Sequence, residues 1–236
     1  MAKDRKNPFN GRDEWLYEDH DQEDFVFSIV QQKDVECVTE FLITNFFANE
    51  PLGHALRLDP DEEVRPWLAE MVAHAIQEKL SILIREKPLE DRESKIVAVC
   101  LNDVERIHEE PDNVTIFSFV DPEKHPCMWK ITRVLDELVK DQDLFVKYDV
   151  PSYIGIQMLS VGPQFGGRGL AKKLIELTET LSRSKGYSLI LSEATSEFSA
   201  RAFLKAGFES KNVLHYDEFT LGSEKPFKLL VEEKVH

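Results

Sequence analysis

The chain has 236 residues, 42% of them hydrophobic and 31% charged, which is enough to bury one sizeable core. With 44 acidic and 29 basic side chains its net charge is −15, so nucleic acid is not expected as a partner, whereas cations are attracted. No apolar run is long enough to cross a membrane and no apolar leader follows Met1, so we expect a cytoplasmic protein without membrane contacts. The 3 cysteines form no Cys-x-x-Cys pair, which predicts neither a disulfide framework nor a zinc site.

The first part of the chain predicts a strand and a helix that follow a polar segment. Residues 1–22 are polar and irregular, and we expect them to be mobile, ahead of a single folded domain over residues 23–236. Phe25–Val30 is a predicted strand. A helix is predicted from about Asp34 to near Asn49, with apolar residues on one face.

Glu50 follows this predicted helix directly. Because Pro51 disfavours helical backbone at the residue before it, Glu50 should lie at or just beyond the C-terminal end of the helix. There the negative end of the helix dipole would raise the pKa of the carboxyl group, which suits a general base that works near neutral pH. A glutamate before proline can instead be a structural cap, and this alternative stays open.

The middle of the chain predicts a helix, two strands and a long insertion. The helix opens at Asp59-Pro60, where a capping residue precedes a proline at the first helical position. Ser81–Arg85 and Lys95–Leu101 are predicted strands. The insertion that follows contains a predicted helix over Trp129–Leu138, and insertions of this size often carry substrate contacts.

A glycine loop between a strand and a helix is the most informative stretch. The strand is Tyr153–Val161, and the helix after the loop ends at Lys185-Gly186, a typical C-terminal cap. Gly166, Gly167 and Gly169 let backbone N–H groups turn toward one point at the helix N-terminus, which is a phosphate-binding geometry. The spacing excludes the nucleoside-triphosphate loop and the dinucleotide-binding loop.

The last part of the chain predicts a short helix between strands. The helix covers Ser196–Ala206 and is closed by Gly207, with strands over Tyr187–Ala194, from Phe208 onward, and over Phe227–Glu233. The pattern contains no internal repeat. It predicts one α/β domain with a mixed, mostly antiparallel central sheet flanked by helices.

Gln164, Gly167 and Gly169 match the pattern Gln/Arg-x-x-Gly-x-Gly/Ala. In this the loop resembles the acyl-CoA pyrophosphate loop of the GCN5-related N-acetyltransferases (GNAT). The resemblance implies a bulged central strand that leads into the loop, acetyl-CoA as cosubstrate, and no metal. The acetyl-CoA contacts that it implies lie on the strand end, the loop, the helix start and the last helix: Leu159, Ser160, Val161, Gln164, Phe165, Gly166, Gly167, Arg168, Gly169, Leu170, Ala171 and Lys205.

Two further stretches, Asn49–Leu52 and Ala194–Phe208, look like the arylalkylamine N-acetyltransferases of invertebrate type. In that family the glutamate of the Glu-Pro-Leu motif is the general base, which implies this role for Glu50. Two hydroxyl residues four apart assist there, and the matching positions are Thr195 and Ser199.

The general acid and the choice of base stay open. Many members of the superfamily use a tyrosine to protonate the departing thiolate, but Phe203 stands in that region here, and phenylalanine cannot donate. The remaining candidates for the acid are water, Ser199, Thr195 and Tyr216. His54 and His215 are rival bases.

The resemblance implies an acetyl-CoA-dependent N-acetyltransferase that acts on the primary amine of a small arylalkylamine. We expect the protein to be a monomer. Two other functions stay open: acetylation of protein lysines or N-termini, and acyl-CoA binding without catalysis in a regulatory module. An apolar cavity beside Glu50 would favour the small amine, and an open groove would favour a protein substrate.

Overall fold

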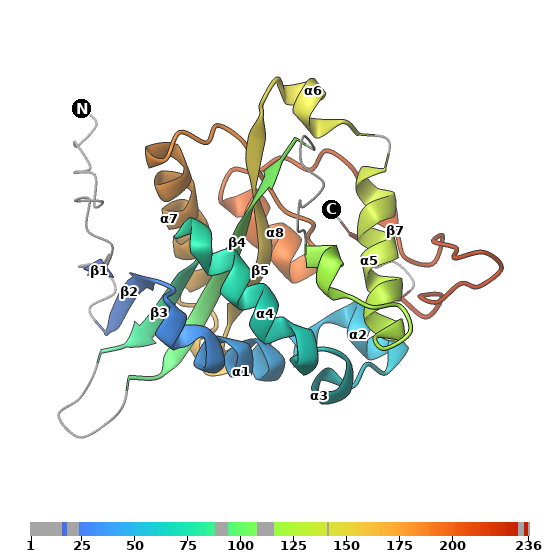
Figure 1. Cartoon of the computed structure of the whole chain (residues 1–236), viewed down its shortest axis with the longest axis horizontal. Coiled ribbons are helices and arrows are strands. Elements are labelled where there is room, and N and C mark those ends of the chain that lie inside the picture. The colour runs from blue at the N-terminus through green and yellow to red at the C-terminus, as the bar shows by residue number, and fades with distance from the viewer. Residues whose placement is uncertain are drawn as a thin grey trace.

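In the computed structural model, residues 16–17, 24–87, 94–107, 116–140, 142–230 and 234–235 are described. They form a six-stranded sheet in which spatial order follows chain order (Figure 1). All neighbouring strands are antiparallel except the last pair, which is parallel, so the predicted mixed sheet is confirmed. The strands are β1 (Leu16–Tyr17), β2 (Phe25–Ile29), β3 (Ile82–Glu86), β4 (Ile96–Arg106), β5 (Ser152–Val161) and β6 (Ile190–Leu191).

Helices cover both faces of this sheet (Figure 1). On β3, Leu83 packs with α1, α4 and α5, whereas its neighbours Ile82 and Ile84 pack with α7 and α8, as the alternation of side chains along a strand requires. The helices are α1 (Val35–Asn45), α2 (Pro51–Leu56), α3 (Pro60–Glu63), α4 (Arg65–Ala75), α5 (Pro126–Val139), α6 (Leu144–Tyr148), α7 (Leu170–Ser184) and α8 (Glu197–Lys205).

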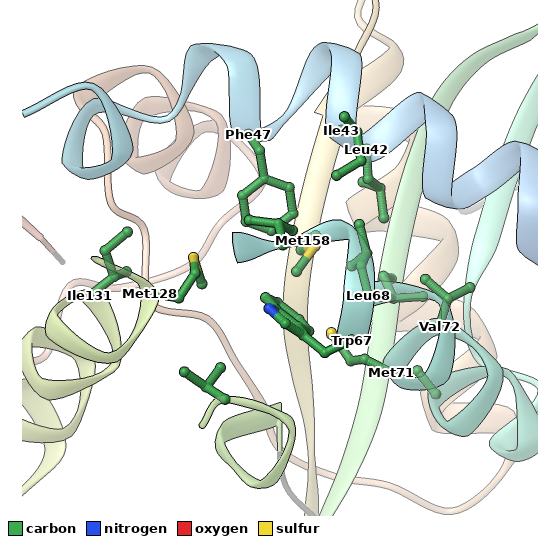
Figure 2. Packing of buried hydrophobic residues seen from close by; sticks show 14 of the residues in the cluster. Leu42, Ile43, Phe47, Trp67, Leu68, Met71, Val72, Met128, Ile131 and Met158 are labelled. Atoms are coloured by element: carbon green, nitrogen blue, oxygen red, sulfur yellow. The ribbon is translucent and has the colours of Figure 1, made fainter. Parts of the chain in front are cut away.

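Aromatic and sulfur-containing side chains fill the core on the α1, α4 and α5 face. Figure 2 shows Trp67 of α4 in the same cluster as Phe47 and Met128, with Met158 of β5 close by. The rings of Trp67 and Phe47 meet edge to face, with centroids 6.2 Å apart. The Trp67 indole N–H donates to the backbone oxygen of Glu63 at 2.6 Å, so this buried ring has its polar atom satisfied.

The register between β4 and β5 changes at one point. Leu101 faces Met158 and Asn102 faces Ile156, so Gln157 is an extra residue on β5 and forms a β-bulge. This confirms the predicted bulge in the central strand.

A buried polar network holds β4 where its register changes. The Asn102 side chain donates to the backbone oxygen of Leu80 at 2.7 Å and to the hydroxyl of Thr178 on α7 at 3.2 Å. The Ser81 hydroxyl accepts from the Asn102 backbone N–H and donates to its backbone oxygen. The network therefore joins β3, β4 and α7 through fully buried groups.

Local signals placed most elements correctly, and the largest differences lie at strand ends. β4 continues to Arg106 beyond the predicted end at Leu101, and α6 was not predicted. Leu16–Tyr17 pairs with β2, although it falls in the segment predicted to be mobile; the rest of that segment lies outside the described residues.

The strands predicted for the C-terminal part of the chain differ from those in the structure. No strand starts at Phe208 in the described part of the chain; β7 (Leu214–His215) pairs instead with β8 (Lys234–Val235) in a separate ribbon. Phe227 lies in a turn, while residues 231–233 are not described. The reason is packing: the Phe227 ring is fully buried against Tyr216 and Phe219, with centroids 6.0 Å away in each case.

Replacing Asn102 by alanine should lower the free energy of unfolding by about 2–3 kcal/mol, because buried groups of Leu80 and Thr178 lose a partner. Urea unfolding measures the change. The control is Asn45→Ala on α1, whose amide bonds only within its own helix and should matter by less than about 1 kcal/mol. Equal effects of the two substitutions would contradict a special role for the network.

Candidate functional site

Glu50 lies between a 3-10 turn, Phe47–Asn49, and helix α2. Its backbone is extended, at φ −77° and ψ 121°, as Pro51 requires. Its side chain caps α2: Oε2 accepts the backbone N–H of Gly53 at 2.5 Å. A raised pKa was predicted from the negative end of the preceding helix, and this cause is wrong. Glu50 lies at the start of α2 instead, where the positive end of the helix dipole favours the charged carboxylate.

The pKa of Glu50 is nevertheless raised, and burial is the main cause. The side chain is only 7% exposed. Hydrogen bonds from the Gly53 and Leu52 backbones, the Thr195 side chain and the charge of His54 act in the opposite direction and lower the pKa. Among the described residues, Oε1 is buried and has no hydrogen-bond partner within contact distance. One carboxylate oxygen is thus held, and the other is available to accept a proton.

Thr195 is the predicted site residue that the fold brings to Glu50. It lies between β6 and α8, and its side chain is near enough to the carboxylate to lower its pKa. Tyr216 holds this segment in place, since its buried hydroxyl donates to the Thr195 backbone oxygen at 2.7 Å. The hydroxyl proton that Tyr216 would give up as a general acid is therefore engaged in this structural hydrogen bond.

Ser199 has a structural use as well. It is the third residue of α8 and forms a capping box with Ser196: each hydroxyl accepts from the other residue's backbone N–H, at 3.1 and 3.2 Å. In the described residues, the side-chain hydrogen bonds of Ser199 go to Ser196 and none goes to Glu50 or Thr195. The catalytic role of Ser199 stays a prediction.

The other titratable candidates fit a catalytic role less well. His54 and His215 are exposed, and a ring nitrogen of His54 lies 2.8 Å from the backbone oxygen of Ala48. Phe203 is a core residue, packed on Phe208 at 5.2 Å between centroids. Lys205 is exposed in the last turn of α8 and makes no described contact with the glycine loop.

The glycine loop has the geometry that its sequence predicts. Gly167 and Gly169 both have φ +76°, in the left-handed region, and a Cβ at either position would meet no atom within 4 Å. Gly169 is the N-cap of the 15-residue helix α7 and supplies no side-chain cap. The first N–H groups of α7 therefore stay available to an anion, at the positive end of a long helix.

Side chains of the loop divide into packed and open ones. Phe165 and Leu170 are buried, so they can contact a ligand only through their backbone, while Gln164 is exposed. The Arg168 guanidinium packs over the rings of Phe25 and Phe165, 5.6 and 5.7 Å from their centroids. Ala171 is partly buried in the first turn of α7.

One edge of β5 is open beside the loop. The Gly162 N–H donates to Val97 on β4, so strand alternation turns the N–H and C=O groups of Leu159 and Val161 away from β4. Ser160, between them, is buried and faces Val99. In the described residues, β6 pairs only with the start of β5, at Ile154 and Gly155. Backbone groups next to the loop can therefore pair with an extended ligand.

The structure also reveals an acidic group that sequence patterns missed. Glu105 faces Tyr153 across β4 and β5, and the Gln157 side-chain N–H₂ lies 3.5 Å from its carboxylate. Burial raises the pKa of Glu105 to about 7, and the charges of Asp103 and Glu193 add to the shift. Alternating Asp103 and Glu105 was the available signal, but the predicted strand stopped at Leu101.

A cavity of about 380 Å³ lies along the outer edge of β6. Its walls come from the end of α5, α6, the end of α7, the segment from Tyr187 to Ala194, α8 and the turn after α8. Glu50 is not among the residues that line this cavity.

No cluster of three or more His, Cys, Asp or Glu side chains in the described ranges could hold a metal ion. Within the same ranges, no helix combines the length and apolar character needed to span a membrane.

Comparisons with known proteins agree with this geometry. Residues 105–208 match the model of the acetyltransferase (GNAT) family. Arylalkylamine N-acetyltransferase 2 from Aedes aegypti is similar over 89% of this chain and 96% of its own, with 28% identity and a TM-score of 0.74. A mosquito arylalkylamine N-acetyltransferase-like protein 5b shares the fold, with 18% identity, 89% and 96% coverage and a TM-score of 0.70. Drosophila melanogaster polyamine N-acetyltransferase also shares the fold, with 23% identity over 90% of this chain and 97% of its own, and a TM-score of 0.69.

Residues 105–208 therefore match an acetyltransferase (GNAT) domain, and the glycine loop at the start of α7 and the open edge of β5 both lie within this range.

Replacing Glu105 by glutamine should make the protein more stable than the wild type, by an amount that grows as pH rises. The folded protein holds the Glu105 proton up to about pH 7, above the ordinary value of 4.5, so the wild type loses stability between these values. Glutamine does not titrate. The advantage of the variant should therefore be small at about pH 5 and largest above about pH 8.

Urea unfolding at the two pH values measures this. The exposed Glu123→Gln is the control and should show no such trend. A Glu105→Gln variant whose stability follows the wild type at both pH values would show that this carboxyl group keeps its ordinary pKa.

Proposed function

We propose that this protein transfers the acetyl group of acetyl-CoA to the primary amine of a small alkylamine or arylalkylamine, with Glu50 as general base. The observation that carries the proposal is the Glu50 carboxylate: it is buried, its pKa is raised, and Oε1 has no partner among the described residues. The similarity to the Aedes aegypti arylalkylamine N-acetyltransferase supports the choice of acceptor.

The reaction needs a base of this kind. An alkylamine reaches the site as ammonium and must lose a proton before its nitrogen can attack a thioester carbon. Oε1 of Glu50 accepts that proton, while the Oε2 bond to Gly53 keeps the carboxylate oriented. When the carbon–sulfur bond then breaks, the leaving thiolate takes a proton from Thr195, Ser199 or water.

Acetyl-CoA would lie across the loop and the open strand edge. The free N–H groups at the start of α7 suit the pyrophosphate. The outward backbone groups of Leu159 and Val161 suit the amides of the pantetheine arm. An N–H near Leu159 can also stabilise the oxyanion of the tetrahedral intermediate.

The burial of Glu50 favours a small acceptor. A base with 7% exposure is reached more easily by a free amine than by a lysine on the surface of another protein. A screen of acetyl-CoA consumption with tyramine, tryptamine, 1,4-diaminobutane and a lysine peptide separates these classes. Acetyl-CoA binding without turnover on any of them would instead favour a regulatory acyl-CoA-binding module.

Alanine at Gly167 should weaken acetyl-CoA binding roughly tenfold or more, because its Cβ would stand in the open space that the phosphates need. Positive φ costs any such variant about 1–2 kcal/mol of stability. Gly186→Ala is a matched control, since Gly186 has φ +90° at the opposite end of α7. Calorimetric titration with CoA measures the affinities, and equal affinity in both variants would refute the loop as the binding site.

Glutamine at Glu50 should lower kcat by about 10²–10⁴-fold, because an amide cannot take the proton. Its carbonyl can still cap α2, so the fold and acetyl-CoA affinity should survive. The fall in the wild-type rate at low pH, which follows the raised Glu50 pKa, should disappear in the variant. Glu36→Gln, exposed on α1, is the control. Wild-type turnover with an unchanged pH profile in Glu50→Gln would leave Glu50 as a cap only.

A further inference from the structure

Polar side chains hold β5 just beyond the point where β6 leaves it. In the described residues, Gly155 is the last position of β5 that pairs with β6, opposite Leu191. The next residue after β6, Ser192, donates its hydroxyl to the backbone oxygen of Ile156 at 3.1 Å. The bulge residue Gln157 follows directly, and its side chain turns toward β4. Side chains therefore fix the place where the sheet divides, in addition to the strand ladder.

The Gln157 side chain folds back over Gly155 to reach Glu105. A Cβ at position 155 would stand 2.6 Å from Nε2 of Gln157 and 3.8 Å from Cγ of Glu105. In the described part of the chain, this Nε2, at 3.5 Å, is the one hydrogen-bond donor to the Glu105 carboxylate. Gly155 itself is buried, with β4 on one side and β6 on the other. The amide thus occupies the space that a side chain at position 155 would fill.

The Glu105 carboxyl group needs this donor. Burial raises its pKa to about 7, and the like charges of Asp103 and Glu193 add to the shift, while Arg106 and the Gln157 amide lower it. A buried acidic group without a donor loses a hydrogen bond that water does not replace. A protonated carboxyl group still has an oxygen that accepts. Gln157 and Glu105 should therefore stay paired on both sides of neutral pH.

The backbone groups that face the open edge of β5 begin directly after Gln157. Met158 is buried in the core close to Trp67 (Figure 2), so the two residues before Leu159 are both held by their side chains. Leu159 is the position whose N–H and C=O turn away from β4. A misplacement of reacting groups by about 1 Å can cost about 100-fold in rate. The position of the bulge therefore matters for any thioester that binds at this edge.

We propose that Gln157, Glu105 and Gly155 are positioning residues for the acetyl-CoA thioester: the Gln157 amide, held above Gly155 by Glu105, fixes the bulge and thereby the outward backbone groups at Leu159. The inference rests on the proposed function. The three residues would act through the backbone of β5, not by contact with the reacting atoms. Because the phosphates would bind at the glycine loop, a disturbed bulge should lower the rate and leave CoA affinity intact.

The first test leaves both polar partners in the chain. Gly155→Ala puts a methyl group where the Gln157 amide lies and should displace it at little cost to the fold, because the displaced atom ends a flexible side chain. We expect kcat with acetyl-CoA and the best amine of the screen to fall at least about tenfold, and the Kd for CoA to change by less than about twofold. Gln157→Met keeps the length but cannot donate, and should cause the same loss. The double variant should lose no more than either single one.

Variants of Glu105 separate position from stability. Glu105→Leu removes the acceptor together with a buried acidic group, so the protein should stay folded while kcat falls. Glu105→Gln keeps an oxygen that accepts from Gln157, and its kcat should stay within about threefold of the wild type. Gln77→Met, at an exposed position in the turn after α4, is the control for Gln157→Met and should change neither kcat nor CoA affinity.

A measurement without turnover shows whether these residues hold the bulge. Amide hydrogen exchange over Ile156–Val161, followed by mass spectrometry, should be faster in Gly155→Ala and in Gln157→Met than in the wild type. Exchange in α7 should stay unchanged in both variants, because α7 does not depend on the bulge.

The outcomes separate this inference from the proposed function. Wild-type kcat in Gly155→Ala or Gln157→Met overturns the inference and leaves the proposed function standing. Equal losses of kcat and CoA affinity overturn it too, since they indicate a general loss of structure. A wild type that acetylates no amine overturns the proposed function. The exchange rates then decide whether the three residues hold the bulge, and unchanged rates would refute that as well.

Discussion

The open strand edge beside the glycine loop exists because β5 is paired along its whole length with β4 but only at its start with β6. β4 follows β5 along its whole length, through the bulge at Gln157, whereas the described part of β6 pairs with it only at Ile154 and Gly155. Beyond that point the main-chain groups of Leu159 and Val161 are left for a ligand, and the strand leads straight into the glycine loop. The open edge of β5 thus continues directly into the glycine loop at the start of α7.

Buried acidic groups are the second theme of this domain. Glu50, Glu105 and Glu193 all have pKa values raised mainly by burial, and each therefore reduces the stability of the fold near neutral pH. The domain offsets this with an extensive apolar core on both faces of the sheet. Such a balance is typical of sites where function and stability conflict.

Local chemistry made much of the fold predictable. The cap at Asp59, the glycine at Gly186 and the turn at Gly169 are set by neighbours in sequence, and the structure has all three where they were expected. The Glu105 group was not predictable, because it depends on Gln157, 52 residues away, and on a register that only the folded sheet defines. For Glu50 the raised pKa was predicted but its cause was not, because the cause is burial by tertiary packing and not a helix dipole.

The bond from Tyr216 to the backbone of Thr195 has a consequence for the order in which the protein matures. A nascent chain that has emerged only as far as Gly207 already contains the sheet from β1 to β6, the glycine loop and α8. It still lacks the aromatic anchor, Tyr216 with Phe219 and Phe227, that fixes Thr195 against Glu50. The glycine loop and the open edge of β5 can therefore assemble during synthesis, whereas the position of Thr195 is fixed only after the segment from Tyr216 to Phe227 has left the ribosome.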